Sequence, residues 1–246
     1  MTPRLDAFLL AATLAAPAAA DLCSSEDETL LWASCGDEAA VDLILMPEGA
    51  GPTPDGALDV TGVYTATDRR EGDRPKPVGL FVHEGDVIGR EYVRFDGVLV
   101  VDAEGRPTIS HRRRAQIGDQ IFDLEDPAAR SAFLSAAAAA GASVAQSHLL
   151  VIDGAVDAFA KEGAPAFRRR ILFQLADGSY GVYDSTPRVL TLAEATEDVA
   201  ARFAPAMAIN LDMGSFDFCR RGPSTCGALS EAGTAKLSNI LRFRGG

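Results

Sequence analysis

Short β-rich runs, paired across polar turns, place the strongest limit on how this chain can fold. Three segments have this form: Val78–Ile88, Val98–Ile109 and Ile171–Tyr183. The turn in the first of them is His83-Glu84-Gly85-Asp86, and the other two turns also combine Gly with acidic residues. This arrangement is typical of β-hairpins, because glycine permits the backbone angles that tight turns require. We therefore expect three β-hairpins.

Single strands and loops complete this β-rich pattern. Three short apolar runs that end in turn or acidic residues are typical of buried strands: Val41–Leu45, Leu149–Ile152 and Met207–Leu211. Two segments rich in Pro, Gly and charge, Pro47–Gly56 and Arg69–Pro77, are expected to be surface loops.

Two helices are predicted from their end signals. Asp126-Pro127 supplies a cap and a first-turn proline, and the Ala-rich run that follows should continue to Ala140 and end at Gly141. Thr191 and Glu194 have the spacing of a capping box, and that helix should run to about Ala204, because Pro205 cannot continue it. The order of elements favours an α+β fold: a single domain whose mixed β-sheet, built from hairpins and short strands, has flanking helices.

Size and charge narrow the possible partners. The chain has 246 residues, 47% of them hydrophobic, and a net charge of −12. No internal repeat or linker divides it, so we expect one domain over 21–246. The acidic balance argues against a nucleic-acid partner, since phosphate neutralisation needs a basic face. An anionic ligand would need a local basic pocket.

The first 20 residues, MTPRLDAFLLAATLAAPAAA, are predicted to be a secretory signal peptide. Arg4 precedes an apolar run that starts at Phe8, and Ala18 and Ala20 suit cleavage before Asp21. The apolar run is too short to span a bilayer, which takes about 20 residues. Leu22 directly before Cys23 does not suit a lipid-acceptor cysteine. We therefore expect a periplasmic or secreted protein with no stable membrane anchor.

Export determines how the four cysteines are interpreted. An even set in an oxidising compartment predicts disulfides, with three possible connectivities. Local pairing is the simplest: Cys23 with Cys35 and Cys219 with Cys226. The first pair would enclose a short helix, which the spacing of Ser25 and Glu28 predicts ahead of Leu30-Leu31-Trp32. A zinc site is disfavoured because neither pair has C-x₂₋₄-C spacing and no His is close in sequence.

Polar residues placed on these elements resemble a known family. Ala208-Ile209-Asn210-Leu211-Asp212, with Gly214 and Ser215 following, resembles the NLDGGGS signature of the phosphodiester glycosidase family. Four further segments resemble this family's motifs in the same order along the chain: Gly62-Val63-Tyr64 with Pro77-Val78-Gly79-Leu80, Gln146-Ser147 with Leu149–Gly154, Arg169 ahead of Asp177-Gly178, and Thr191–Glu194. The match runs from about Val60 to Asp217.

This resemblance implies an activity and roles for named residues. Family members act on sugars joined through a phosphodiester. Asp212 would supply the carboxylate that stabilises positive charge on the sugar, and Arg169 would hold the phosphate through charge-assisted hydrogen bonds. Asn210 and Gln146 would position hydroxyl or amide groups. The rest of the expected substrate-binding set is Gly214, Tyr64 and His148.

The chain also departs from the family's motifs. Val60 stands where the family has Asn, His148 replaces a Gly after Gln-Ser, and Met213 replaces the Gly after the signature Asp. Glycine at such positions permits close approach of a ligand to the backbone, so His148 and Met213 would reshape the pocket.

The remaining charged residues have simpler interpretations. The triplets Arg112-Arg113-Arg114 and Arg168-Arg169-Arg170 are typical of solvated faces balanced by acidic neighbours, and the resemblance changes this reading for Arg169 alone. Asp102, Asp153 and Asp177 are most simply turn residues.

Two functions follow. One is a hydrolase that cleaves a sugar from a glycosyl phosphodiester in an envelope or surface glycan. The other is a non-catalytic relative that binds a glycan or an envelope protein. The sequence indicates neither a cofactor nor a metal, and it carries no signal for a particular oligomeric state.

Overall fold

The strands of this protein pair with their neighbours in antiparallel fashion. The computed structural model describes residues 22–46, 50–69 and 72–245, so the predicted signal peptide, 1–20, lies outside the described residues. Every strand pairing within those ranges is antiparallel. The expected mixed sheet is therefore wrong in this respect. Short hairpin connections give antiparallel neighbours, whereas parallel pairing needs a long crossover.

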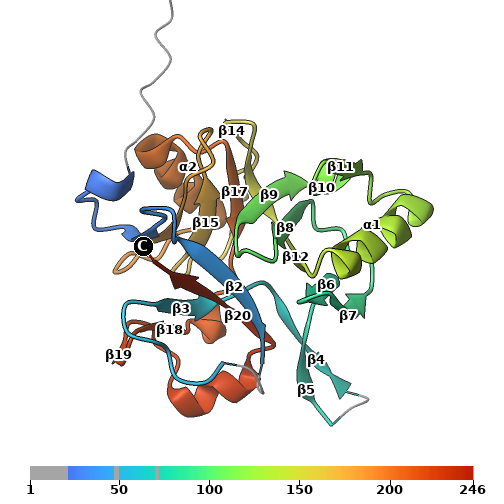
Figure 1. Cartoon of the computed structure of the whole chain (residues 1–246). Helices are drawn as coiled ribbons and strands as arrows, with labels where there is room; N and C mark the ends of the chain where they lie inside the picture. The colour runs from blue at the N-terminus through green and yellow to red at the C-terminus, as the bar shows by residue number, and fades with distance from the viewer. Residues whose placement is uncertain (1–21, 47–49, 70–71, 246) are drawn as a thin grey trace, which may run out of the picture.

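A six-stranded sheet carries the C-terminal part of the family-like motifs. Its order is β1-β16-β15-β17-β13-β14. The strands are β1 (Leu30–Ala33), β13 (Leu149–Ile152), β14 (Ala155–Val156), β15 (Arg170–Gln174), β16 (Tyr180–Asp184) and β17 (Met207–Asn210). Helix α2 (Leu192–Phe203) covers one face of this sheet (Figure 1). Phe173 of β15 stacks on Phe203 of α2 with 4.8 Å between ring centroids.

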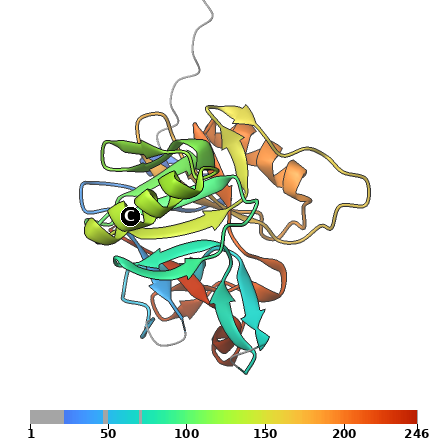
Figure 2. The same ribbon diagram turned by 90° about the vertical axis from the view of Figure 1, so that its right-hand side faces the viewer.

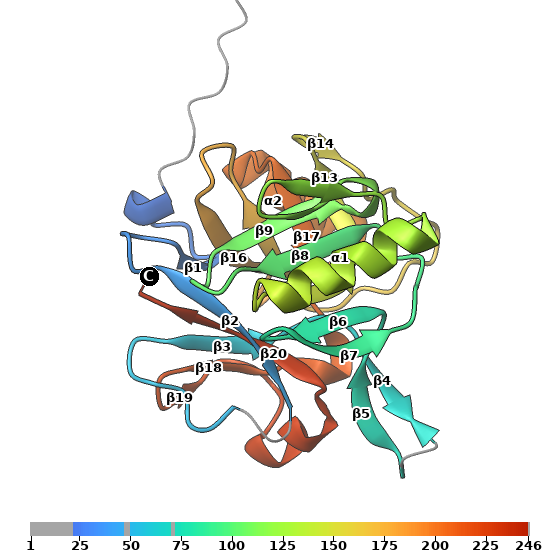
Figure 3. The same cartoon turned by 45° about the vertical axis from the view of Figure 1, so that its right-hand side comes forward.

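A second sheet packs against the other helix. Its order is β7-β6-β12-β8-β9, with β6 (Leu80–His83), β7 (Asp86–Arg90), β8 (Gly97–Val101), β9 (Pro107–His111) and β12 (Ser143–Ser147). Helix α1 (Pro127–Ala139) crosses its outer face (Figure 3). Phe133 and Leu134 of α1 belong to the same apolar cluster as Val82 and Val98 of the sheet. The small hairpin of β10 (Ala115–Ile117) and β11 (Gln120–Phe122) adjoins α1.

A third sheet completes the core, with the order β19-β18-β3-β20-β2. Its strands are β2 (Ala40–Leu45), β3 (Leu58–Thr61), β18 (Cys219–Arg221), β19 (Ser224–Thr225) and β20 (Asn239–Arg244). One buried apolar cluster draws residues from all three sheets, including Leu43, Leu99 and Ile209. The remaining elements that lie wholly within the described ranges are the hairpin of β4 (Thr65–Asp68) and β5 (Arg74–Pro77) and the 3₁₀ helices Leu22–Ser24, Arg112–Arg114, Gly214–Phe216 and Glu231–Lys236.

Both helices begin and end where their sequence signals place them. The Asp126 side chain accepts a hydrogen bond from Ala129 N, and the residue after the last helical turn of α1, Gly141, has φ +63°. Thr191 and Glu194 form the reciprocal capping box of α2, which ends at Ala204 in the left-handed conformation.

The three predicted hairpins and three predicted buried strands are confirmed, but the segment around Trp32 is not a helix. Leu30–Ala33 forms β1 at an edge of the six-stranded sheet. The preceding residues make a turn, in which Asp27 Oδ1 accepts a hydrogen bond from Thr29 N at 2.9 Å. Trp32 is 6% exposed and packs on Tyr180 and Phe243. Burial of this large side chain against partners distant in sequence overrides the local capping signal.

Arg69–Pro77 is also more regular than the predicted loop. Arg74–Pro77 pairs with Thr65–Asp68 in a two-stranded sheet that projects from the body (Figure 3). Proline lacks a backbone N–H, and a two-stranded ribbon tolerates it because each strand has one unpaired edge.

The two predicted local disulfides are present. Cys23 bonds to Cys35 with 5.6 Å between Cα atoms, and Cys219 bonds to Cys226 with 4.9 Å. Within the described ranges, no helix is both long and apolar enough to cross a bilayer. The same residues contain no cluster of three or more His, Cys, Asp or Glu side chains arranged to hold a metal ion.

Candidate active site at the end of β17

The last residue of β17 and the two residues after it are fixed by three other segments. Asn210 N donates to His148 O at 2.9 Å, Leu211 N to Arg170 O at 3.1 Å, and Asp212 N to Gly62 O at 2.8 Å. These hydrogen bonds bring the family-like segments around Gly62, Gln146, Arg169 and Asn210 to one end of the six-stranded sheet.

Asp212 is a buried carboxyl group with an unusual pKa. Asp212 is 7% exposed, and its Oδ2 accepts a hydrogen bond from Thr65 N at 3.0 Å. Burial raises the pKa of Asp212 to about 6, against the lowering effect of hydrogen bonds from the backbone N–H groups of Thr65 and Met213. A carboxyl group with such a shifted pKa at a strand end is a candidate catalytic group.

Tyr64 and Asn210 form a polar pair beside Asp212. Asn210 Nδ2 donates to the Tyr64 hydroxyl at 2.7 Å. Burial, followed by the charge of Asp212, raises the pKa of Tyr64 to about 12. The phenol therefore stays protonated at neutral pH. Because its oxygen already accepts from Asn210, its own proton is available for donation to a substrate.

Two aromatic rings flank Tyr64, and we call Tyr64, Phe95 and His148 the aromatic cluster. Phe95 stacks on Tyr64 with 4.9 Å between centroids, and His148 meets the rings of Tyr64 and Phe95 edge-on at 5.8 and 4.6 Å. The His148 side chain is 45% exposed, and its Nδ1 lies 3.9 Å from Asp96 Oδ1. His148 thus forms part of the wall beside Tyr64.

Arg169 is anchored through main-chain carbonyl groups. Its Nε donates to Leu190 O at 3.0 Å and its Nη2 to Pro165 O at 2.8 Å, and the guanidinium lies over the Phe167 ring. Burial lowers the pKa of Arg169 below its ordinary value, and the interaction with Tyr64 opposes this change. No carboxylate of the described residues forms an ion pair with it. A partly desolvated cation without a protein anion is a candidate site for an anionic ligand.

Gln146 and Gly214 lie at the margins of this group. Gln146 is fully buried, its Oε1 accepts from Leu80 N at 2.8 Å, and its Nε2 has no hydrogen-bond partner among the described residues. Gly214, at φ +79°, begins a 3₁₀ turn two residues after Asp212 and lines a cavity of about 300 Å³. Met213 has φ −138°, an extended conformation that its side chain tolerates.

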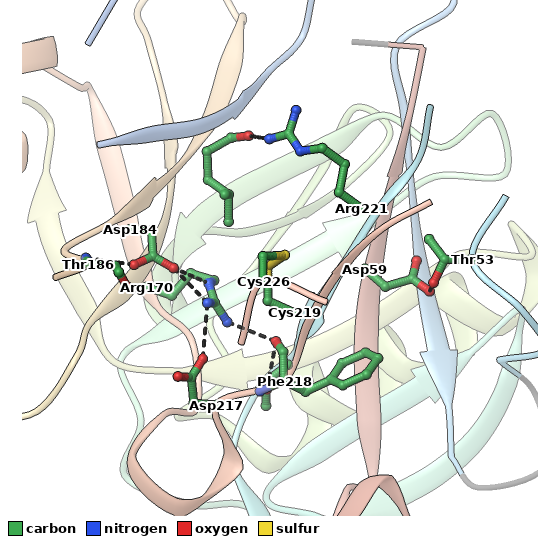
Figure 4. The surroundings of a disulfide bond; sticks show 12 residues. Thr53, Asp59, Arg170, Asp184, Thr186, Asp217, Phe218, Cys219, Arg221 and Cys226 are labelled. Carbon is green, nitrogen blue, oxygen red and sulfur yellow. Dashed lines mark hydrogen bonds and ion pairs between the residues drawn. A yellow bond between two sulfur atoms is a disulfide. The ribbon is translucent and has the colours of Figure 1, made fainter. Parts of the chain in front are cut away.

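Arg170, expected on a solvated face, is instead buried beneath the loop that follows Asp212. It is 1% exposed, and its Nη2 lies 2.6 Å from Asp184 Oδ2 and 3.2 Å from Asp217 Oδ1. Its Nη1 donates to Phe218 O at 2.9 Å, beside the Cys219–Cys226 disulfide (Figure 4). The strand position of Arg170, directly before an apolar run, was the sequence signal for its burial. This ion cluster fixes the C-terminal end of the loop, at Asp217 and Phe218.

Other expectations about charged residues hold. Arg112 and Arg113 pair with Glu125, and Arg114 pairs with Asp153. Asp153 has φ +50° in a turn, and Asp177 accepts from Ser179 N at 2.9 Å. These groups balance surface charge or close turns.

Comparison with known proteins supports the fold. No protein-family model matches this chain, and no curated protein matches it by sequence. The catalytic domain of zebrafish N-acetylglucosamine-1-phosphodiester alpha-N-acetylglucosaminidase, auto-inhibited by its pro-peptide, superposes with a TM-score of 0.53 over 84% of this chain and 73% of its own, at 11% identity. An exported protein of Burkholderia pseudomallei superposes with a TM-score of 0.51 over 84% of this chain and 71% of its own, at 14% identity. The likeness establishes a shared fold.

Proposed function

We propose that this protein is an exported hydrolase that cleaves a sugar from a glycosyl phosphodiester in an envelope or surface glycan. The observation that carries the proposal is the buried carboxyl group of Asp212, which lies beside the Tyr64–Asn210 pair in a fold shared with a phosphodiester glycosidase domain. The two disulfides support an oxidising compartment outside the cytoplasm, in agreement with the predicted signal peptide.

The chemistry follows from the leaving group. The bond between the anomeric carbon and the phosphate oxygen breaks, and its electron pair leaves with the phosphate monoester. Positive charge develops on the sugar, and the ionised carboxylate of Asp212 stabilises that charge. Water then adds its oxygen to the anomeric carbon and releases a proton to solvent. A phosphate leaving group is already a stable anion, so protonation of it by a strong acid is not required.

Arg169 and Tyr64 would act on the phosphate. Arg169 offers a charge that no described carboxylate neutralises, and charge-assisted hydrogen bonds to phosphate are about twice as strong as neutral ones. The Tyr64 hydroxyl would donate a hydrogen bond to a phosphate or sugar oxygen. The aromatic cluster provides a partly apolar wall, on which a sugar ring can pack.

The alternative function, a module that binds a glycan without cleaving it, is favoured by one feature. His148 stands at a position where the family motif has glycine, and its ring packs edge-on against the Tyr64 ring. A ring at this position narrows the approach to the Tyr64 hydroxyl. One panel of glycosyl phosphodiesters shows whether the protein cleaves such a compound or only binds it.

The test uses the mature, oxidised protein and a panel of sugar 1-(4-nitrophenyl phosphate) diesters of both anomers. A glycosidase releases 4-nitrophenyl phosphate, which becomes coloured only after a phosphatase is added, whereas a phosphodiesterase releases nitrophenolate directly. We expect phosphatase-dependent colour and incorporation of ¹⁸O from labelled water into the sugar. Direct release of nitrophenolate, or sugar binding without any release across the panel, would refute the proposed reaction.

A further inference from the structure

A cavity adjoins the candidate site on the side of the Asp212 turn. It has a volume of about 300 Å³, and its walls include Phe167, Arg168, Val189, Gly214, Ser215 and Asp217. Phe167 comes from the long connection between β14 and β15, which Figure 2 shows as a yellow-gold loop extending beside α2. Val189 lies on the connection between β16 and α2.

Two links join this cavity to the candidate site. Along the chain, Gly214 follows Asp212 by two residues and begins the 3₁₀ turn. Through space, the Phe167 ring centroid lies 5.2 Å from the Arg169 guanidinium, whose charge in turn acts on Tyr64. Phe167 therefore lines the cavity and also packs against Arg169, the expected phosphate-binding residue.

The local charge suits an anion. Asp217 is 4% exposed and neutralised, because Arg170 Nη2 lies 3.2 Å and Arg168 Nη1 3.5 Å from its carboxylate, and Ala228 N donates to it at 3.2 Å. Arg168 and Arg170 thus pair with the nearby carboxylates of Asp184 and Asp217. Arg169 donates instead to two main-chain carbonyl groups, so its charge has no carboxylate partner among the described residues.

The cavity also has apolar side chains in its walls that are exposed to solvent. Phe167 is 42% exposed and Val189 is 62% exposed. They are two of the six exposed large apolar side chains among the described residues, and both line this one cavity. Single exposed apolar residues are common, but two on one cavity wall beside a cation match a ligand with an apolar group next to an anion.

We infer that this cavity binds the aglycone of the substrate, and that the aglycone is an alkyl or aryl group esterified to the phosphate. The inference rests on the proposed function for its orientation: the sugar lies toward Asp212 and Tyr64, the phosphate at Arg169, and the apolar group against Phe167 and Val189. Glycosyl phosphodiesters with apolar aglycones are then better substrates than those that join two sugars.

The experiment measures binding and turnover separately. Binding of octyl phosphate and methyl phosphate, each below any micelle concentration, is measured by calorimetry on the wild-type protein and on Val189→Ser. Ile121→Ser is the matched control, because Ile121 is an exposed apolar residue, 68% exposed, on the distant β11 strand. We expect octyl phosphate to bind to the wild-type protein at least tenfold more tightly than methyl phosphate. Val189→Ser should reduce this ratio of affinities by about tenfold. Ile121→Ser should leave the ratio unchanged.

Turnover of octyl and methyl glycosyl phosphodiesters distinguishes the two proposals. A tenfold preference in kcat/KM for the octyl ester, reduced in Val189→Ser, supports the cavity assignment. Binding of octyl phosphate that depends on Val189, without hydrolysis of either ester, supports the cavity and refutes the glycosidase. Equal binding of octyl and methyl phosphate, or a preference that Val189→Ser leaves intact, overturns the inference even if hydrolysis is observed.

Discussion

Asp212→Asn is expected to reduce turnover of glycosyl phosphodiesters by about a thousandfold and, at pH 7.5, to make the protein more stable. Both effects have one cause. In the native protein a carboxylate that stabilises the transition state is held in a buried place where its charge is unfavourable. An amide at the same position keeps one hydrogen bond from Thr65 N and removes the charge.

The pH dependence of the stability gain follows from the pKa. Burial raises the pKa of Asp212 from 3.8 to about 6, so between these values the folded state binds more protons than the unfolded state. Stability contributed by this group therefore falls as pH rises from about 4 to about 6, by at most about 3 kcal/mol. Asp212→Asn should gain most of that amount above pH 6.5 and almost none at pH 4.

Urea unfolding at pH 4 and at pH 7.5 measures this gain. Asp153→Asn is the matched control, because Asp153 has a largely exposed side chain and stands in a turn with φ +50°, which asparagine tolerates. The control should keep full activity and nearly full stability at both pH values. Loss of stability in Asp212→Asn at pH 7.5 would contradict the account of Asp212 as a carboxylate whose charge is unfavourable in its buried place.

Arg170→Met is expected to cost about 3 to 5 kcal/mol of folding free energy at pH 7. Arg170 is 1% exposed and contacts the carboxylates of Asp184 and Asp217. Burial alone would raise the pKa of Asp184, but the charge of Arg170 and hydrogen bonds from Thr186 and Arg170 hold it below its ordinary value. Without Arg170, two buried carboxylates lose their main cationic partner.

The sign of the pH dependence is fixed by the same observation. A lowered pKa contributes stability above the unfolded value, near 3.8, and that stability is lost as pH falls through this range. The difference between wild type and Arg170→Met should therefore be largest at neutral pH and should shrink as pH falls, because protonation of the buried carboxyl groups relieves the variant. Arg114→Met, which removes an exposed pair with Asp153, is the control and should cost less than 1 kcal/mol. Equal costs for the two variants in denaturant titrations would refute the structural role of Arg170.

Local signals predicted much of this fold. The hairpin around Gly85 and the cap at Asp126 were readable because each depends on residues a few positions apart. The apolar run Met207–Leu211 also indicated a buried strand that ends ahead of Asp212. These are features in which sequence neighbours determine the outcome.

Features that depend on distant partners were not readable. Arg170 contacts Asp184, Asp217 and Phe218 at sequence separations of 14, 47 and 48 residues, so the local sequence does not identify its ionic partners. The strand at Leu30–Ala33 was likewise hidden, because its partner strand lies about 150 residues away.

The aromatic cluster was missed in part for the same reason. Phe95 belongs to no recognisable motif, and its contact with Tyr64 and His148 exists only because three connections bring them together. Its role in shaping the approach to Tyr64 follows from the structure.

The most direct test of the central claim is the pH dependence of kcat/KM between pH 4 and 9 for a glycosyl phosphodiester that the protein hydrolyses. If the ionised carboxylate of Asp212 stabilises the transition state, kcat/KM should rise through an apparent pKa of about 6 and reach a plateau above it. Below that pKa the rate should fall tenfold for each pH unit. A rate that is constant from pH 4.5 to 7, or that rises as pH falls through 6, would show that the ionised form of Asp212 is not the working group.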